Sequence, residues 1–175
     1  RFLKADSVLP MRRLVRYQKT PPHLNKALDT WDESFRDWGD KAKRFDDRFF
    51  ALPVGETTVR PKGTRIDKPL VVLTDAANSS ATFAFAQRVK STRVGKLVGE
   101  ATGGNQRGIN GGAFFFVRLP ASGIEFDLPL VGSFPLQPAP DAGIEPDVKV
   151  ELSAVDIATG IDAQMERALA IAKGG

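Results

Sequence analysis

The sequence predicts a mixed α/β fold, and the segment around residues 68–89 shows this most clearly. Residues 70–73 read Leu-Val-Val-Leu between Pro69 and Asp75, and a short unbroken apolar run of this kind is typical of a strand buried on both faces. A polar turn at residues 75–79 follows, and apolar residues then recur at helical spacing through Val89. We therefore expect a strand, a tight turn and a helix in this order.

The amino-terminal third is expected to be less regular. Residues 1–17 mix apolar and charged side chains and predict a short helix or an edge segment broken at Pro10. Residues 23–38 carry leucine and aromatic side chains at three- and four-residue steps, which predicts an amphipathic helix ending at Gly39 with its aromatic stripe in the core. Residues 41–63 are charged and irregular and predict a loop or lid.

The carboxy-terminal part returns to regular patterns. Glu125 and Asp127 alternate with apolar residues on one arm of an expected hairpin, so a half-exposed strand explains them better than a paired acid/base site or a metal site. The expected elements are a buried strand at 96–98, hairpin arms at 113–119 and 124–128, a final strand at 147–152, and a helix packed through Ile161, Met165, Ala168, Leu169 and Ala172.

Length and composition limit the possible functions. With 175 residues and 42% hydrophobic content the chain can form one core, so we expect a single domain in which residues 1–67 are a helical and lid-like region and residues 68–175 the core. The absence of cysteine excludes disulfides, thiol catalysis and cysteine-bound metals. One histidine and scattered carboxylates predict no metal site, no cofactor signature is found, and no apolar run is long enough to cross a membrane.

A serine stands where the predicted helix begins. Ser79 or Ser80 would lie beside the first unpaired N–H groups of that helix, and the positive end of the helix dipole suits a developing oxyanion. This arrangement predicts nucleophilic attack by a serine, with the backbone N–H of Ala81 as one oxyanion donor. The alternative is that Ser79 only caps the helix, as many serines do at such a boundary.

Three segments in order resemble the tail-specific, or carboxy-terminal processing, serine peptidases and their tricorn-core relatives. They are Asn78-Ser79-Ser80-Ala81-Thr82-Phe83, Val98-Gly99-Glu100-Ala101-Thr102-Gly103-Gly104, and Gly143-Ile144-Glu145-Pro146-Asp147-Val148. The resemblance covers about residues 68–173 and places the family's nucleophile on Ser80. It implies a crotonase/ClpP-like fold of repeated strand-strand-helix units, a peptide-hydrolysing activity on polypeptide substrates, and a periplasmic or other extracytoplasmic location.

The chain departs from both branches of that family at the catalytic base. Asn105 stands where the processing branch has its lysine, and an asparagine cannot act as a base. The glutamate that assists the tricorn-like branch falls on Pro140, which leaves Asp141 beside it as the candidate assisting acid. The chain begins at Arg1, and we expect it to be part of a longer protein whose upstream part supplies the base; this fragment alone is then expected to be inactive.

The remaining candidates concern substrate binding and partners. The glycine-rich run at residues 103–112 lacks the order of a nucleotide loop, so close backbone approach to a peptide is expected at Gly103, Gly104 and Asn105. Arg107 could pair with a substrate carboxylate or be solvated. His23, beside two prolines, is expected at the surface rather than as a base.

Composition and pattern leave other functions open. The basic side chains near the amino terminus are expected to form a solvated face, because no nucleic-acid motif accompanies them. A non-catalytic module that binds a peptide or ligand in the same cleft is the main alternative function, and an enzyme acting on an acyl thioester is a weaker one. The sequence does not determine the oligomeric state.

Overall fold

The computed structural model describes residues 2–174, apart from the side chains of residues 55–57. These residues form two compact units. The first contains the described residues up to Leu9, Thr57–Gln106 and the described residues from Pro140, and the second contains Pro10–Glu56 and Arg107–Ala139. Strands and helices occur together, which confirms the mixed α/β fold class.

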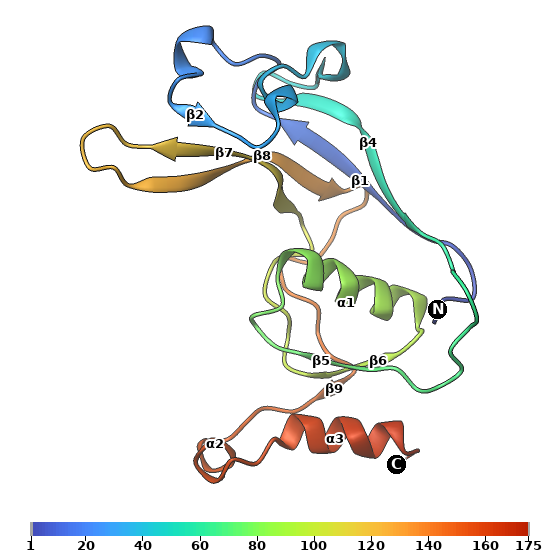
Figure 1. Cartoon of the computed structure of the whole chain (residues 1–175). Coiled ribbons are helices and arrows are strands. Elements are labelled where there is room, and N and C mark those ends of the chain that lie inside the picture. Colours follow the sequence, from blue (N-terminus) through green and yellow to red (C-terminus); the bar gives the residue numbers. More distant parts are fainter. Residues whose placement is uncertain (1, 175) are drawn as a thin grey trace. The chain divides into compact units, whose positions relative to one another are not determined.

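The first unit is built on a small parallel sheet. Its strands are β5 (Val71–Thr74), β6 (Lys96–Gly99) and β9 (Val148–Lys149), in the order β5-β6-β9. This sheet lies between helix α1 (Ser80–Thr92) on one face and helix α3 (Ala163–Ala172) on the other (Figure 1). The core between α1 and the sheet consists of Phe83, Ala86, Val89, Leu97 and Ile144, with Leu70 and Val72 packed against it.

The predicted strand, turn and helix are present, but the strand is less buried than expected. β5 lies at one edge of the sheet, and three of its four residues are only partly buried. β6 is the central strand, and Leu97 and Val98 are fully buried. The apolar run of β5 therefore packs against α1 and α3 from an edge position.

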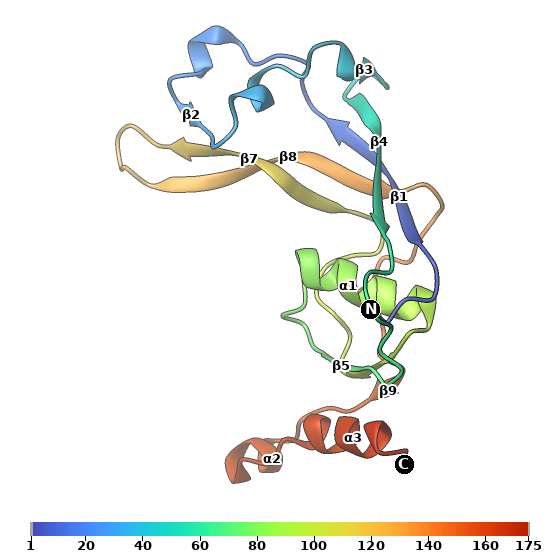
Figure 2. The same cartoon turned by 45° about the vertical axis from the view of Figure 1, so that its right-hand side comes forward.

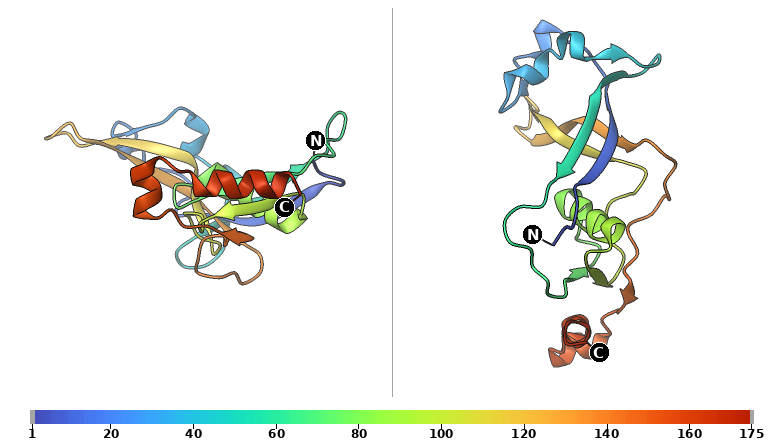
Figure 3. Two further views of the ribbon diagram at one scale, coloured as in Figure 1. Left: turned by 90° about the horizontal axis from the view of Figure 1, so that it is seen from below. Right: turned by 90° about the vertical axis from the view of Figure 1, so that its right-hand side faces the viewer.

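The carboxy-terminal helix α3 exists where the sequence predicts it, but Ala168 is the one residue of the predicted packing stripe that is buried, and Ala172 is exposed. Ala168 and Gln164 are buried, whereas Ile161, Met165 and Leu169 are 42–49% exposed. The Gln164 amide donates to the Val150 carbonyl at 2.9 Å, so a polar side chain occupies the inner face. A short helix α2 (Ala154–Thr159), not expected from the sequence, precedes α3 and begins with a capping box. Figure 3 shows both helices from below.

The second unit is an antiparallel sheet. In the part of the chain that is described, it has six strands in the order β2-β7-β8-β1-β4-β3. The longest pair, β7 (Ile109–Arg118) and β8 (Glu125–Pro135), forms the predicted hairpin with longer arms than expected (Figure 2). Glu125 and Asp127 are exposed on β8, but Phe126 and Leu128 are also 44% and 43% exposed, so this arm lacks the buried apolar face that the alternation predicted.

The expectation of a helix over residues 23–38 is wrong. That segment contains 3-10 turns η1 (Pro22–Leu24) and η2 (Glu33–Arg36), followed by η3 (Gly39–Lys41), and a short strand β2 (Leu28–Asp29) paired with β7. The carboxylates of Asp29, Asp32 and Asp37 accept the nearby N–H groups of Thr30, Ser34 and Gly39 at 2.8–2.9 Å. Such local bonds compete with helix formation.

The aromatic side chains of that segment form a cluster. The prediction that they pack in the core holds for only some of them. Phe35 and Trp38 stack and pack against the core of this unit, whereas Trp31 is 60% exposed beside Phe114 and Phe116. The aromatic spacing therefore predicted the packing of Phe35 and Trp38 correctly, but it did not predict the backbone conformation.

Residues 1–17 and 41–63 contain long strands that the sequence analysis did not predict. β1 (Ser7–Val15) pairs with β8 from Met11 to Leu14, so Pro10 lies within the strand just before this pairing and does not break it. β3 (Lys43–Arg44) pairs with β4 (Phe50–Val59), where a loop or lid was expected. The chain segment described here has no helix that is both long and apolar enough to span a membrane.

Candidate active site

The turn before α1 is held by its own side chains. The Asp75 carboxylate accepts the N–H of Ala77 at 2.8 Å, and the Asn78 side-chain oxygen accepts the N–H of Asp75 at 2.7 Å. The Asn78 N–H also donates to the Asp75 carbonyl at 3.1 Å. Asp75 and Asn78 thus close the turn reciprocally and fix the point from which α1 starts.

Ser80 is the first residue of α1 and has a left-handed backbone. Its φ is +52°, a conformation that costs a residue with a Cβ about 1–3 kcal/mol and that clusters at functional sites. The side chain is exposed at the junction of β5, the turn and α1. A strained, exposed serine between a strand and a helix is the arrangement in which a nucleophile is presented to a substrate.

Ser79 behaves differently from Ser80. It occupies the N-cap position with an extended backbone, yet its side chain makes no capping hydrogen bond. Its carbonyl instead accepts the Thr82 N–H at 3.1 Å and the Thr82 hydroxyl at 2.8 Å. The alternative that Ser79 caps the helix through its side chain therefore finds no support in the described residues.

The beginning of α1 can stabilise negative charge. The first N–H groups of a helix have no acceptor within that helix, and in α1 these include the N–H of Ala81, next to Ser80. The helix has 13 residues and no acidic residue in its first turn, so its positive end is not neutralised locally.

The glycine-rich segment after β6 lies against the Ser80 turn. A Cβ on Gly103 would lie 2.1 Å from the Ala76 carbonyl oxygen, and a Cβ on Gly104 would lie 3.1 Å from the Phe83 ring. Gly104 also has a φ of +83°. These two positions therefore bring the backbone of the segment against the turn and the first turn of α1.

The two residues that replace the expected catalytic partners are in direct contact. The Asn105 side-chain amide donates to the Asp141 carboxylate at 2.5 Å. The neighbouring backbone also joins these segments, because the Gln106 N–H donates to the Ala142 carbonyl at 2.9 Å and the Thr102 N–H to the Ile144 carbonyl at 3.1 Å. Residues 101–106 and 141–144 therefore form one hydrogen-bonded pair of segments.

The structure explains why a glycine occupies the first position of the Gly99-Glu100 pair. Gly99 has a φ of +124°, and a Cβ there would lie 2.3 Å from the Thr74 carbonyl oxygen. The same carbonyl accepts the Glu100 N–H at 2.7 Å, and the Thr74 hydroxyl donates to the Glu100 carbonyl at 2.8 Å. This glycine thus lets β6 approach the end of β5, directly before the Ser80 turn.

Arg107, a predicted substrate-binding residue, and His23, which was expected at the surface, both belong to the second unit. His23 is exposed in η1, and Arg107 is exposed just before β7. Among residues 2–174 no three histidine, cysteine, aspartate or glutamate side chains are grouped so that they could hold a metal ion.

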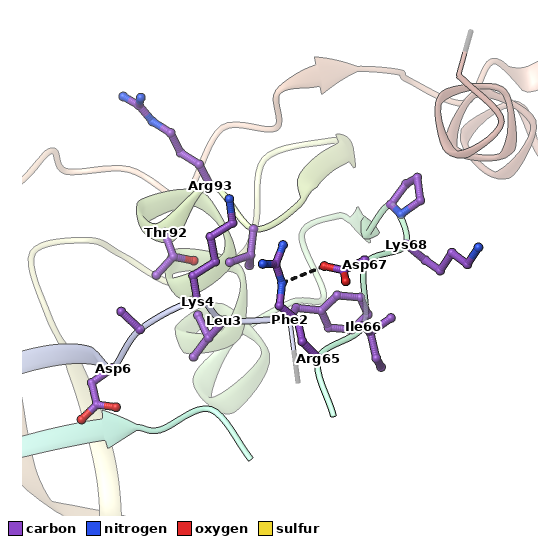
Figure 4. Close-up of a pocket in the computed structure, with 13 residues that line it drawn as sticks. Phe2, Leu3, Lys4, Asp6, Arg65, Ile66, Asp67, Lys68, Thr92 and Arg93 are labelled. Carbon is purple, nitrogen blue, oxygen red and sulfur yellow. Dashed lines mark ion pairs between the residues drawn. The ribbon is translucent and has the colours of Figure 1, made fainter. Parts of the chain in front are cut away.

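One cavity of the first unit lies away from Ser80. It has a volume of about 790 Å³ and lies between residues 2–6, residues 65–69 and the carboxy-terminal end of α1 at Thr92 and Arg93. Figure 4 shows this cavity with the Arg65–Asp67 ion pair beside it. Because Ser80 is at the opposite end of the 13-residue helix, this cavity is not the candidate active site.

The sequence matches a known family over most of its length. A sequence profile of Peptidase family S41 matches residues 2–150. The chain belongs to peptidase family S41. This membership supports a serine peptidase domain that acts on polypeptides; the tricorn-like branch stays a prediction.

A solved structure supports the same fold. The chain is similar to the crystal structure of a candidate peptidase from Parabacteroides merdae, with a TM-score of 0.51 and 21% sequence identity. The match covers 97% of this chain and 44% of that chain, so this S41 chain spans less than half the length of the protein it resembles. A search of curated proteins found no match.

Reasoning from the sequence missed the residues that shape the site. Asp75 and Asn78 carried a recognisable signal, since both residue types favour turns in which the side chain bonds the backbone. The left-handed backbone of Ser80 left no signal, because serine is uncommon in that conformation.

Proposed function

We propose that this S41 chain is part of a serine endopeptidase in which Ser80 is the nucleophile. The observation that carries the proposal is the position of Ser80, exposed and left-handed at the start of α1. Its Oγ attacks a peptide carbonyl carbon and gives up its proton to a base, and the amine leaves with a proton returned by that base.

In this proposal the Ala81 N–H donates a hydrogen bond to the negative charge that develops on the substrate's carbonyl oxygen. Loss of one such donor typically lowers the rate about 100- to 1000-fold. The backbone of Gly103 and Gly104 lies against the turn that carries Ser80, and we assign it, with Asn105, to holding the peptide main chain. Arg107 is proposed to pair with a substrate carboxylate.

The base is proposed to come from a part of the protein outside these 175 residues. The chain has a single histidine, His23, which was expected at the surface and is exposed in η1. Asn105 carries no basic group, and Asp141 binds its amide. Asp141 is proposed as the acid that assists this base, and the chain alone is proposed to be inactive.

A non-catalytic peptide-binding module is the second candidate. Asn105 favours it, because the residue that would be a basic lysine in the processing branch has become an amide bound to Asp141. Such a module would keep the glycine-rich segment and bind peptides without cleaving them.

A serine-directed phosphonate separates the two candidates, because an unactivated serine does not react. The full-length protein, its Ser80→Ala variant and its Ser79→Ala variant are treated with the reagent, and the modified peptide is identified by mass spectrometry. We expect labelling and peptide cleavage in the wild type and in Ser79→Ala, and neither in Ser80→Ala. Labelling at Ser79, or unchanged cleavage by Ser80→Ala, would contradict the assignment.

We also propose a location outside the cytoplasm, on the basis of the family resemblance. Fractionation of the source cells with an antibody against this chain tests it, and recovery of the protein only in the cytoplasmic fraction would reject it.

A further inference from the structure

Four arginines of the second unit are stacked on phenylalanine rings. The guanidinium carbons lie 5.1–5.3 Å from the ring centroids, in pairs formed by β1 and the β3–β4 hairpin. The pairs are Arg12 on Phe45, Arg16 on Phe49, Arg44 on Phe50, and Arg48 on Phe49. We call these seven residues the arginine–phenylalanine surface.

The hairpin tip that carries this surface is held by a set of short hydrogen bonds. The Asp46 carboxylate accepts the N–H groups of Arg48 at 2.8 Å and Phe49 at 2.7 Å. The Phe45 N–H donates to the Phe49 carbonyl at 3.0 Å, and the Arg44 guanidinium donates to the Asp47 carbonyl at 3.0 Å. Ring and backbone contacts together fix the guanidinium positions before any partner binds, which lowers the entropy lost on binding.

The four guanidinium groups have little local counter-charge. Within the described residues none of them forms an ion pair with a carboxylate. The hairpin tip also carries Asp46 and Asp47, so two carboxylates stand against these four guanidinium groups. Excess positive charge therefore remains on an exposed, ordered surface.

We propose that the arginine–phenylalanine surface binds an acidic segment of a polypeptide substrate. The planar guanidinium fork matches the two oxygens of a carboxylate. Each ring already carries a guanidinium group, so the surface offers charge and hydrogen-bond donors rather than open rings for base stacking. The inference rests on the proposed function for the polypeptide nature of the ligand, but it needs no step at Ser80.

The test measures binding alone, in the full chain with Ser80→Ala. A fluorescent peptide rich in glutamate and a matched peptide with glutamine in its place are titrated by fluorescence anisotropy. We expect the glutamate peptide to bind, more weakly as salt is added, and the glutamine peptide to bind at least about tenfold more weakly. The paired change Arg16→Gln with Arg48→Gln is expected to weaken binding of the glutamate peptide about tenfold.

Two further variants test the role of the rings and forks. Phe49→Leu removes the ring below Arg16 and Arg48 but keeps both charges, so a loss of a few-fold is expected from lost pre-organisation. Arg16→Lys with Arg48→Lys also keeps the charge and removes the forks, and a similar loss is expected. Circular dichroism of each variant confirms that it is folded.

The control pair is Lys26→Gln with Arg118→Gln, which removes the same charge elsewhere in the second unit. An equal loss of binding in both pairs would overturn the proposal, and so would tighter binding of a single-stranded oligonucleotide or of anionic lipid vesicles than of the glutamate peptide. The endopeptidase is tested separately by phosphonate labelling of the full-length protein, so binding of the glutamate peptide without labelling of Ser80 would reject the endopeptidase and leave this surface standing. Cleavage by the full-length protein without selective binding of the glutamate peptide would reject this surface and support the endopeptidase.

Discussion

The Asp147 carboxylate joins Lys90 of α1 to the first residues of β6. One oxygen lies 2.7 Å from Lys90 Nζ, and the other accepts the N–H of Leu97 at 2.8 Å. Lys90 Nζ also donates to the Glu145 carbonyl at 2.9 Å. The aspartate of the Gly-Ile-Glu-Pro-Asp run is therefore structural, because it ties the helix that begins with Ser80 to the central strand below it.

Asp147→Ala is expected to destabilise the chain. The change leaves the N–H of the fully buried Leu97 without its acceptor, which costs about 1–3 kcal/mol of unfolding free energy. Urea unfolding of both proteins measures the difference. Glu151→Ala is the control, because its ion pair with Lys149 is about two-thirds exposed on both sides and its loss should cost no more than about 1 kcal/mol.

The same carboxylate predicts an acid-sensitive stability. Burial raises the pKa of Asp147, but the Leu97 N–H and the Lys90 ammonium lower it more, so the pKa lies below its ordinary value of 3.8. The stabilisation is then complete above the unfolded pKa and is lost as the pH falls through 3.8 toward the lower folded pKa. Unfolding midpoints between neutral pH and this range should fall more steeply for the wild type than for Asp147→Asn. Parallel curves would show that Asp147 does not contribute.

Sequence patterns predicted the elements that depend on local spacing and missed those that depend on distant pairing. The segment from β5 to β6 and the β7–β8 hairpin follow from neighbouring residues. In contrast, β1 is a strand because Met11 pairs with Pro135, more than a hundred residues away. The helix predicted over residues 23–38 is absent for another reason. The carboxylates of three aspartates accept hydrogen bonds from nearby backbone N–H groups, and these bonds compete with helix formation.

For the site, the sequence located the nucleophile candidate but not its surroundings. Ser80 stands at the helix start as expected, whereas its left-handed backbone and the turn closed before it by Asp75 and Asn78 were not predicted. The contact of Asn105 with Asp141 joins positions 36 residues apart. Spacing in the sequence carries no information on such a contact.

Ser80→Gly is expected to be more stable than Ser80→Ala. Glycine adopts a φ of +52° without the Cβ clash that alanine retains, and the difference should be about 1 kcal/mol of unfolding free energy. Chemical unfolding of the two variants gives the value. Both should lack cleavage in the full-length protein, so stability and activity separate.

Ser91, which is exposed within α1, provides the matched comparison. At this position the stability difference between the glycine and alanine variants should have the opposite sign. Ser91→Gly should be less stable than Ser91→Ala by up to about 1 kcal/mol, because glycine disfavours helical backbone and Ser91 lies in the last turn of α1. Equal effects at Ser80 and Ser91 would mean that Ser80 carries no backbone strain.

Gly103→Ala is expected to damage both stability and cleavage. The new Cβ would lie 2.1 Å from the Ala76 carbonyl oxygen, and neither backbone can yield without moving the turn before Ser80. Overpacking of this kind costs about 1–3 kcal/mol, and a displaced nucleophile can lower the rate about 100-fold. Urea unfolding and peptide cleavage by the full-length protein measure the two effects.

Gly112→Ala separates this clash from ordinary loss of a glycine. Gly112 has a φ of +76° and nothing within 4 Å of an added Cβ, so only backbone strain is introduced. We expect a loss of about 1 kcal/mol with unchanged cleavage. If Gly103→Ala also kept full cleavage, the glycine-rich segment could not be what holds the Ser80 turn in its active position.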